Sequence, residues 1–599
     1  MSAMVSVRFL VFLTTLVGCT AAEDPTVELK SGKVAGRVVE FAHKDVDVKC
    51  TVHVFQGIPY AQPPIGDLRF QAPKPNRPWE GVRDAKELGK ACIQPYISVF
   101  PMDEPQSEDC LYLNIYAPQR ESGKLPVMVW IHGGALFMGS GGTYYDGTAL
   151  AALGDVILVA INYRLGPFGF LSTGDEHATG NYGFLDQVLA LQWVQDNIAA
   201  FGGDASKVTI FGESAGAISS EFLVLSPLTD GLFHRAILQS GTASAQGYIS
   251  TDVAWQNKIA HGLGKLVGCE RETSEELVEC LRSVPAEDFK DHSNVETGQL
   301  ANITGLGVDL DSIPFPPVID GKVVAESPMD LIRDGTFPKR GIDLMVGVLA
   351  DEGQGFIVSI MPNTVNDTDV NLNRALYEAI YPAMIGRDKK YNPAVVDAVK
   401  LMYVNWGDAD SEDANYFEAL SQTIGDMYFV CPADLSARAH SEAGSNVYLY
   451  HMTHIPAQSF IKIKWLKAAH GEDLPFVFGW HFDIVKDWTM PEDDVKLSLK
   501  VIKYWTNFAK TGNPNLSDGD VKAWDEESQS EWPLFKVPGL EYKDLSLKME
   551  TKRALKAKEC AFWNDFIPKL MKHTEAAQVC TTAEDDEKVK YKEENHKKP

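Results

Sequence analysis

The chain has 599 residues, of which 45% are hydrophobic and 23% charged, proportions that are ordinary for a globular protein with a sizeable core. Its formal net charge is −27, which argues against a nucleic-acid-binding role because the phosphates would be repelled. No run of about 18 or more apolar residues follows the N-terminal segment, so no membrane span is expected.

The first 22 residues have the pattern of a secretory signal peptide. Arg8 is the only charge before a mainly apolar run over residues 9–17, and small residues close the segment as far as Ala22. The pattern predicts cleavage after Ala22 and a secreted, extracellular protein. A competing interpretation is a bacterial lipid-anchor site, because residues 16–19 read Leu-Val-Gly-Cys.

The cysteines and the Asn-x-Ser/Thr triplets fit an exported chain. Nine cysteines are present, and loss of Cys19 with the leader leaves eight, an even number that suggests disulfides. No pair has Cys-x-x-Cys spacing, so a zinc ribbon or thioredoxin-type site is not expected. In a secreted protein the three triplets become candidate glycosylation sites, at Asn302, Asn366 and Asn515.

Four short apolar runs between residues 125 and 241 are bounded by turn residues and predict buried strands: 126–131, 156–161, 208–211 and 236–239. Between the second and third runs, apolar residues recur every three or four positions from Leu185 to Ile198, which predicts an amphipathic helix. Strands that alternate with helices predict an α/β fold around a central, mostly parallel sheet flanked by helices.

A candidate nucleophile closes the third of these runs. Residues 211–216 read Phe-Gly-Glu-Ser-Ala-Gly, and residues 215–225 could form the helix that follows. This is the strand–turn–helix context that a Gly-x-Ser-x-Gly nucleophile elbow requires, with Gly212 and Gly216 relieving crowding in a strained turn. The motif alone also fits a chance turn, and its context favours Ser214 as a nucleophile.

A glycine-rich turn at the end of the first run supports the same chemistry. Residues 131–135 read Ile-His-Gly-Gly-Ala, and small residues let backbone N–H groups approach a reacting carbonyl. An acyl-transfer site needs such donors where negative charge develops, and the N–H of Ala215 would be another. The alternative is an ordinary glycine turn with no catalytic role. The presence of Ser214 downstream favours the oxyanion-hole interpretation.

Serine is a poor nucleophile until a base takes its proton. His470 lies in an expected loop before the apolar segment 474–479, and Glu352 ends another strand-like run, with Asp351 as its competitor. Each has an alternative interpretation, a structural histidine or a solvated acidic turn. The chain order serine, acid, histidine is the order found in α/β-hydrolases.

Two groupings of possible metal ligands do not meet the requirements of a site. His451 and His454 are three apart and the run over 447–452 is strand-like, and residues three apart along a strand point to opposite faces. Three aspartates hint at a calcium loop over 408–419, but Asp413 occupies the position that requires glycine. We therefore expect no metal and no organic cofactor.

At these residues the chain resembles the type-B carboxylesterase and cholinesterase family, over roughly Val27 to Leu570. Further matching stretches are Gln-Gly-Ile-Pro-Tyr-Ala at 56–61, Leu-Arg-Phe at 68–70, Glu-Asp-Cys-Leu-Tyr-Leu-Asn at 108–114, Asn-Tyr-Arg-Leu-Gly at 162–166 and Gly-Asn-Tyr-Gly at 180–183. The resemblance implies an α/β-hydrolase fold, a triad of Ser214, Glu352 and His470, and oxyanion donors at Gly134, Ala135 and Ala215. The expected organisation is a signal peptide over 1–22, a catalytic domain over 23–574 and a charged, disordered tail over 575–599.

The resemblance also implies a covalent framework. It pairs six cysteines as Cys92–Cys110, Cys269–Cys280 and Cys431–Cys560. Cys50 and Cys580 are left over, and they could pair together, stay free or, for Cys580, link two chains as a homodimer. Arg69 and Glu108 resemble the structural ion pair of the family.

Departures from the family pattern bear on specificity. Ala135 replaces the third glycine of the oxyanion turn, and Lys467 replaces a glycine before the histidine. Residues 93–109 contain no tryptophan, whereas cholinesterases use one there to hold the choline cation, which argues against a cholinesterase. Residues 311–315, which resemble the acyl pocket, lack paired aromatics and predict a roomier pocket.

The expected function is hydrolysis of small-molecule carboxylic esters through an acyl-enzyme intermediate. A first alternative is an esterase for juvenile-hormone-like methyl esters, although such family members often carry glutamine where this chain has Glu213. A second is a catalytically silent adhesion protein. Silent relatives usually lack the nucleophile and carry a transmembrane segment, whereas Ser214, Glu352 and His470 all stand here.

Overall fold

The structure, a computed structural model, describes residues 24–97, 104–245, 247–290, 313, 315–337, 341–386, 393–482, 484–486, 488–516 and 531–574. The predicted signal peptide, the charged tail over 575–599, Asn302 and Cys580 lie outside these residues. No helix within the described ranges is long and apolar enough to cross a membrane.

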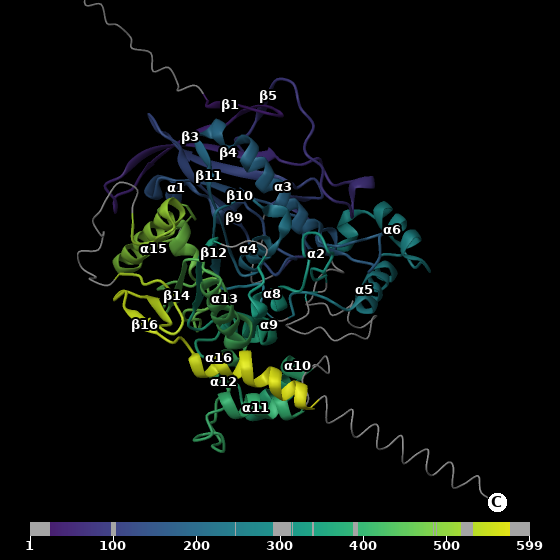
Figure 1. Cartoon of the computed structure of the whole chain (residues 1–599), viewed down its shortest axis with the longest axis vertical. Coiled ribbons are helices and arrows are strands. Elements are labelled where there is room, and N and C mark those ends of the chain that lie inside the picture. The colour runs from purple at the N-terminus through teal and green to yellow at the C-terminus, as the bar shows by residue number, and fades with distance from the viewer. Residues whose placement is uncertain are drawn as a thin grey trace, which may run out of the picture.

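The described chain folds around one eleven-stranded sheet in the order β16-β15-β14-β13-β12-β11-β9-β10-β8-β4-β3 (Figure 1). Its parallel part comprises β9 (Leu125–Ile131), β10 (Ile157–Ile161), β11 (Gly203–Glu213), β12 (Arg235–Gln239), β13 (Asp343–Leu349), β14 (Val447–Met452) and β15 (Glu541–Leu545). Antiparallel strands complete both edges: β3 (Arg37–Ala42), β4 (Lys49–Pro59) and β8 (Tyr112–Pro118) at one, and β16 (Thr551–Arg553) at the other. The predicted α/β fold with a mostly parallel sheet is confirmed.

The central strands read as unbroken apolar runs because both faces of the sheet are covered. Every residue of β9 and β10 is buried. Successive side chains of a strand point to opposite faces, so Val127 and Val129 pack into one hydrophobic cluster while Met128 and Trp130 pack into another. The fold thus has two hydrophobic cores, one on each side of the sheet.

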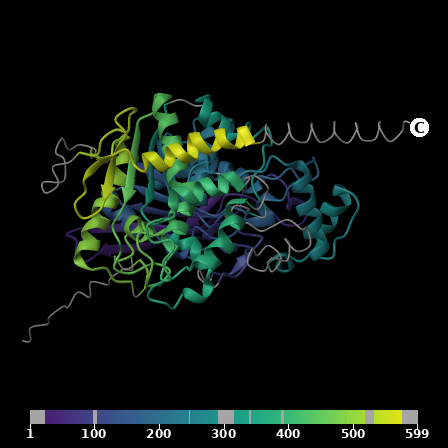
Figure 2. The same ribbon diagram turned by 90° about the horizontal axis from the view of Figure 1, so that it is seen from below.

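Helices from distant parts of the sequence cover these two faces. The first core includes side chains of α3 (Tyr182–Asn197) and α4 (Ala215–Leu225), and the second those of α1 (Thr148–Gly154) and α15 (Glu492–Thr511). Figure 1 shows α1 and α15 next to each other on one flank of the sheet, and Figure 2 gives the view from below. The motifs at the ends of β9, β11 and β13 therefore lie in the middle of the molecule.

The amphipathic helix expected over 185–198 forms as α3, but it is buried on nearly all sides. Asp186 is fully buried and accepts three hydrogen bonds from Arg164, at 2.7, 2.8 and 3.0 Å. The spacing of hydrophobic residues does not predict the burial of Asp186, because a partner from another part of the chain compensates the cost of burying its charge. The Arg164–Asp186 pair links α3 to the turn after β10.

We expect Arg164→Met to lower the free energy of unfolding by about 3–5 kcal/mol, because it leaves the buried Asp186 carboxylate without its charge partner. Urea denaturation followed by circular dichroism measures the change. Arg374→Met is the matched control, since the Arg374–Asp410 pair is exposed and should contribute no more than about 1 kcal/mol. Equal destabilisation by the two substitutions would show that the buried Arg164–Asp186 pair is no more important for stability than an exposed pair.

Three disulfides join six of the described cysteines, as Cys92–Cys110, Cys269–Cys280 and Cys431–Cys560. These are the pairs that the resemblance implies. The last ties the start of α13 (Cys431–Glu442) to α16 (Ala557–Ala561), 129 residues later in the chain. Within the described ranges, Cys50 on β4 is free.

Candidate active site

Ser214 lies on a sharp turn between β11 and α4. Its backbone adopts φ 56° and ψ −126°, a strained conformation for a residue with a side chain. The Ser214 N–H donates to the carbonyl of Gln239 at 2.8 Å, and its carbonyl accepts from the N–H of Ile218 at 3.0 Å. These bonds hold the elbow between β12 and the first turn of α4, with Ser214 7% exposed.

Glycines let this elbow pack closely against the neighbouring strand. A Cβ atom at Gly216 would collide with the carbonyl oxygen of Ile131 at the end of β9, and a Cβ at Gly212 would also crowd it. Ordinary side chains at these two positions would push the serine turn away from β9. The Gly-x-Ser-x-Gly spacing is therefore explained by the approach of two backbones.

The glycine-rich turn after β9 lies beside the serine. A Cβ at Gly133 would come within 3.1 Å of Cβ of Ser214. Gly134, Ala135 and Leu136 all have positive φ, and the Gly134 carbonyl accepts from the N–H of Met138 at 3.0 Å. The N–H of Ala215, at the first position of α4, is one of the donors that a helix leaves without an intrahelical acceptor.

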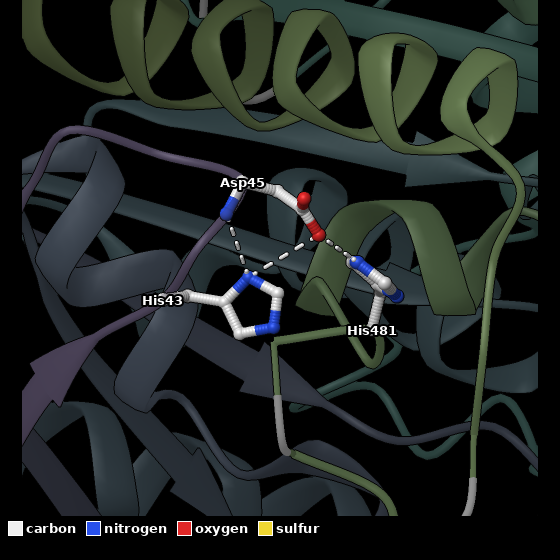
Figure 3. A group of neighbouring side chains, drawn as sticks. All are labelled: His43, Asp45 and His481. Carbon is white, nitrogen blue, oxygen red and sulfur yellow. Dashed lines mark hydrogen bonds and ion pairs between the residues drawn. The ribbon is translucent and has the colours of Figure 1, made fainter.

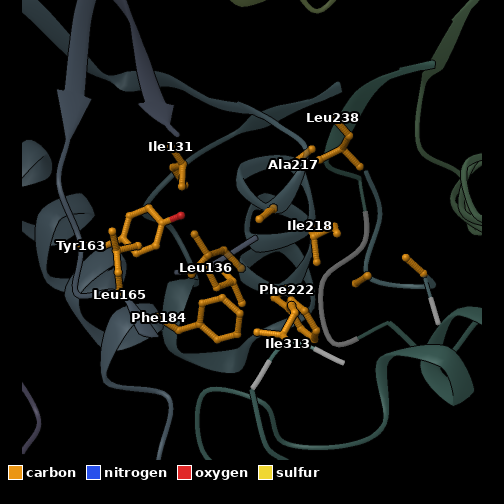
Figure 4. Packing of buried hydrophobic residues seen from close by; sticks show 14 of the residues in the cluster. Ile131, Leu136, Tyr163, Leu165, Phe184, Ala217, Ile218, Phe222, Leu238 and Ile313 are labelled. Atoms are coloured by element: carbon orange, nitrogen blue, oxygen red, sulfur yellow. The ribbon is translucent and has the colours of Figure 1, made fainter. Parts of the chain in front are cut away.

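Apolar side chains hold α4 and this turn in place. Figure 4 shows Leu136, Ile218 and Phe222 in one buried group, with Ile131 and Leu238 from the adjoining strands. Ile313, from the stretch that resembles the acyl pocket, belongs to the same group and is labelled beside Phe222. The elbow is thus built on a rigid, dry support.

Glu352 and His470 are in direct contact. The Nδ1 atom of His470 lies 2.6 Å from Oε2 of Glu352, whose other oxygen accepts from the N–H of Leu349 at 2.8 Å. A parallel bridge between Asp351 and Ala469 joins the turn after β13 to the histidine loop. The two residues, 118 positions apart, are therefore fixed to each other by both backbone and side-chain contacts.

The imidazole of His470 is packed between aromatic rings and lies next to the serine elbow. Its centroid is 4.5 Å from the ring of Phe429 and 5.1 Å from that of Phe356. Its Nε2 is 3.2 Å from Oε1 of Glu213, the residue before Ser214. Among the described residues Nε2 has no hydrogen-bond partner, so Ser214 and His470 are neighbours without a bond between them.

Buried charges set the protonation of the site. Burial lowers the pKa of His470, but the carboxylates of Glu213 and Glu352 outweigh it and raise that pKa to about 9. Burial raises the pKa of Glu213 to about 8, against the opposing effect of His470. Because His470 and Glu213 are in direct contact, the two groups titrate as a pair.

Burial also raises the pKa of two acids that follow the histidine, to about 8 for Glu472 and about 6 for Asp473. Asp473 accepts a hydrogen bond from the amide of Gln239 at 2.8 Å, and Glu472 accepts one from the hydroxyl of Ser459 at 2.5 Å. The charges of Glu213 and Asp473 also act on the imidazole of His470. Buried groups whose pKa values are shifted in this way are typical of functional sites.

The structure brings the predicted site residues to one place, at the carboxyl ends of β9, β11 and β13. Sequence reasoning missed the contact of Glu213 with His470, although Glu213 was visible beside the nucleophile. In contrast, the ion pair between Arg69 and Glu108 was expected from the family resemblance. The two side chains form a bidentate pair with bonds of 2.6 and 2.5 Å.

The fold, with its serine elbow and its acid–histidine pair, defines an α/β-hydrolase. A family model described as "Carboxylesterase family" matches residues 23–563. The chain is 37% identical to "Carboxylesterase 1D" of Rattus norvegicus over 581 aligned residues. The alignment covers 92% of this chain and 96% of the relative. It is equally similar to "Carboxylesterase 1D" of Mus musculus, over 93% of this chain and 96% of the relative.

"Cocaine esterase" of Homo sapiens is also 37% identical, over 568 residues that cover 92% of this chain and 93% of the relative. The chain therefore belongs to the carboxylesterase family. Its activity is that of a carboxylic-ester hydrolase.

Proposed function

We propose that the chain is a secreted serine carboxylesterase in which Ser214 is the nucleophile, His470 the general base and Glu352 the acid that orients the imidazole. The observation that carries the proposal is the 2.6 Å contact between Glu352 and His470, held against the elbow of Ser214. A histidine whose Nδ1 is bound to a buried carboxylate presents Nε2 to the nucleophile in the correct tautomer.

Acylation follows from this arrangement. Ser214 Oγ attacks the ester carbonyl while Nε2 of His470 takes its proton, and Glu352 stabilises the imidazolium that forms. The N–H groups of Gly134, Ala135 and Ala215 stabilise the negative oxygen of the tetrahedral intermediate. His470 then returns the proton to the departing alcohol.

Deacylation repeats the steps with water. His470 removes a proton from a water molecule, which attacks the acyl-serine carbonyl, and the same N–H groups stabilise the second intermediate. The protonated histidine then returns its proton to Ser214 Oγ as the carboxylic acid leaves. Both half-reactions use the same six groups: the side chains of Ser214, His470 and Glu352 and the three backbone N–H donors.

The proposed substrates are carboxylic esters with a range of acyl groups. The support is the composition of the acyl-pocket stretch, which lacks paired aromatics and whose Ile313 and Phe315 are buried in the first hydrophobic core. Glu213 at the position before the nucleophile favours a general esterase over one specific for juvenile-hormone-like methyl esters. A substrate panel that includes such methyl esters separates the two.

Secretion is supported by the disulfides, which persist in oxidising compartments. Asn366 is exposed and suits a glycan. The amide nitrogen of Asn515 donates to Asn513 and to the carbonyl of Trp532, both at 2.9 Å, so glycosylation there would disturb existing bonds. We therefore expect Asn366 to be the more fully modified of the two.

The test of the proposed function is a rapid-mixing assay with p-nitrophenyl esters of increasing acyl length. An acyl-enzyme mechanism predicts a burst of p-nitrophenol for the esters whose deacylation is slow, with an amplitude of up to one per active site. The length profile then measures the acyl pocket. A burst of p-nitrophenol that leaves no covalent acyl group on the protein when the reaction is quenched in acid would contradict the proposal.

We expect Glu213→Gln to shift the acid limb of the kcat/KM profile to lower pH. Catalysis needs neutral His470, and the negative charge of Glu213 is among the causes that raise the pKa of His470 to about 9. Removing that charge lowers the pKa, so the active form persists further into acid. Profiles from pH 5 to 10 check this, with Glu279→Gln on the exposed side of α6 (Ser274–Ser283) as the control. If the acid limb stays at the same pH in Glu213→Gln, Glu213 does not raise the pKa of His470.

A further inference from the structure

A second cluster of chemically capable side chains lies outside the proposed active site. His43 and Asp45 belong to the connection between β3 and β4, and His481 follows α14 (Leu474–Phe478), 436 positions after Asp45 (Figure 3). Because β3 is the outermost strand, the cluster joins one edge of the sheet to the segment that continues from the histidine loop. The ester mechanism gives these residues no task.

The three side chains point their ligand atoms at one another. The Nε2 atom of His481 is 2.7 Å from Oδ2 of Asp45, and Nδ1 of His43 is 3.5 Å from the same oxygen. One ligand atom from each residue lies within 4.8 Å of the other two. In a tetrahedral zinc site with bonds of about 2.0–2.2 Å, ligand atoms are roughly 3.4 Å apart, so small side-chain adjustments suffice.

The imidazoles are held in position, whereas the carboxylate faces water. The side chains of His43 and His481 are each 9% exposed, and that of Asp45 is 33% exposed. The two imidazole centroids are 5.0 Å apart, edge to face, and the ring of Phe482 lies 5.2 Å from that of His43. Fixed rings with an open side leave room for a water molecule as a fourth ligand.

The local charge suits a cation. Asp45 offers a partly exposed carboxylate, a group that is ordinarily ionised at neutral pH. Glu492, at the start of α15, is close enough to feel the charge of Asp45. Lys44 approaches the same oxygen at 3.6 Å, but its side chain is 79% exposed and is free to move into water.

We propose that His43, Asp45 and His481 form a binding site for a divalent transition metal of the zinc type. Two imidazole nitrogens and one carboxylate oxygen are a donor set that suits Zn²⁺ and disfavours Ca²⁺ and Mg²⁺. The metal would clip the β3–β4 connection to the segment after α14. Its role is to stabilise the fold near the histidine loop, apart from the ester chemistry.

Metal binding would replace hydrogen bonds that the imidazoles of His43 and His481 now make. The N–H of Met490 now donates to Nδ1 of His481, and the N–H of Asp45 to Nδ1 of His43, each at 3.3 Å. Both bonds are long, and the metal-bound form would give them up. Without metal, the Asp45–His481 hydrogen bond and the ring contacts of His43 join the two segments.

The test is a zinc titration of the full secreted chain, expressed without a histidine tag and freed of metal with a chelator. Isothermal calorimetry in the presence of a competing chelator should give one ion per chain. His43→Gln and His481→Gln should each weaken the Kd for Zn²⁺ by more than about tenfold. His261→Gln on α5 (Val253–Leu266) is the control and should leave the Kd unchanged.

Thermal unfolding provides a second readout that does not depend on esterase activity. The Tm of the wild type should rise with Zn²⁺ concentration, because the metal binds the folded chain, and the Tm of the variants should not. If either histidine variant fails to fold without metal, Asp45→Asn at the more open position decides the question. Absence of stoichiometric zinc binding, or binding that the three substitutions leave unchanged, would overturn the proposal.

Discussion

Ser214→Ala should lower kcat/KM for p-nitrophenyl esters by roughly 10⁴- to 10⁶-fold. The substitution removes the atom that forms the acyl-enzyme, whereas the oxyanion turn and the substrate-binding surface remain. A loss of this size corresponds to about 5–8 kcal/mol of transition-state stabilisation. Steady-state assays with protein purified from the medium measure it, and circular dichroism shows whether the fold is kept.

The matched control for Ser214 is Ser220→Ala on the same helix. Ser220 is buried, and its hydroxyl donates to the carbonyl of Gly216 at 2.8 Å, so the variant loses one hydrogen bond within α4 and keeps the Ser214 hydroxyl. We expect it to keep the wild-type order of activity. Full activity of Ser214→Ala would identify another nucleophile, and equal inactivation by both variants would point to a packing effect.

His470→Gln should cause a loss of similar size, because glutamine fills much of the space of the imidazole but cannot accept the serine proton. The buried carboxylate of Glu352 would also lose the partner that now lies 2.6 Å away. Activity is measured across pH 6–10. If the substitution only raised the pKa of the catalytic base, activity would return at high pH, whereas loss of the base abolishes activity at every pH. His177→Gln, in the bend formed by residues 174–177, is the control.

Glu352→Gln separates orientation from proton transfer. An amide at this position can still contact Nδ1 but cannot stabilise the imidazolium, so the expected loss is about 10⁴-fold, smaller than that of His470→Gln. A loss of less than tenfold would mean that Glu352 is structural. In that case Asp351, the neighbouring competitor in the sequence, would be the next residue to test as the acid.

Local patterns predicted the parallel centre of the sheet because both of its faces are covered. Buried parallel strands are short apolar runs between turns, and 126–131 and 156–161 form β9 and β10 almost without change. The edge strands β3, β4 and β8 were not predicted. The residues of β3 and β4 mix exposed and buried positions, and the pairing of β4 with the buried β8 joins segments that lie far apart in the chain.

The site residues were predictable to different degrees. Ser214 carries a motif, and the glycines that permit its turn are part of that motif. Glu352 and His470 carry weak signals alone and were chosen because a family resemblance aligned them. Their contact depends on the bridge between the β13 end and the histidine loop, a long-range feature that no local pattern contains.

Contacts between distant segments explain what sequence reasoning left out. The position of Glu213 opposite His470 depends on how the loop after β14 folds back over β11. The cluster of His43, Asp45 and His481 joins residues more than 400 positions apart. No spacing rule for metal ligands applies over such a distance, so the cluster appears only once the sheet edge and α14 are packed.

The central claim, that Ser214 is the nucleophile of a covalent mechanism, is tested most directly by labelling with a fluorophosphonate ester and locating the adduct by peptide mass spectrometry. The account predicts one adduct per chain, on the peptide that contains Ser214, with loss of esterase activity in proportion to labelling. It also predicts much slower labelling of His470→Gln. Complete inactivation with Ser214 unmodified, or a stoichiometric adduct on another residue, would contradict it.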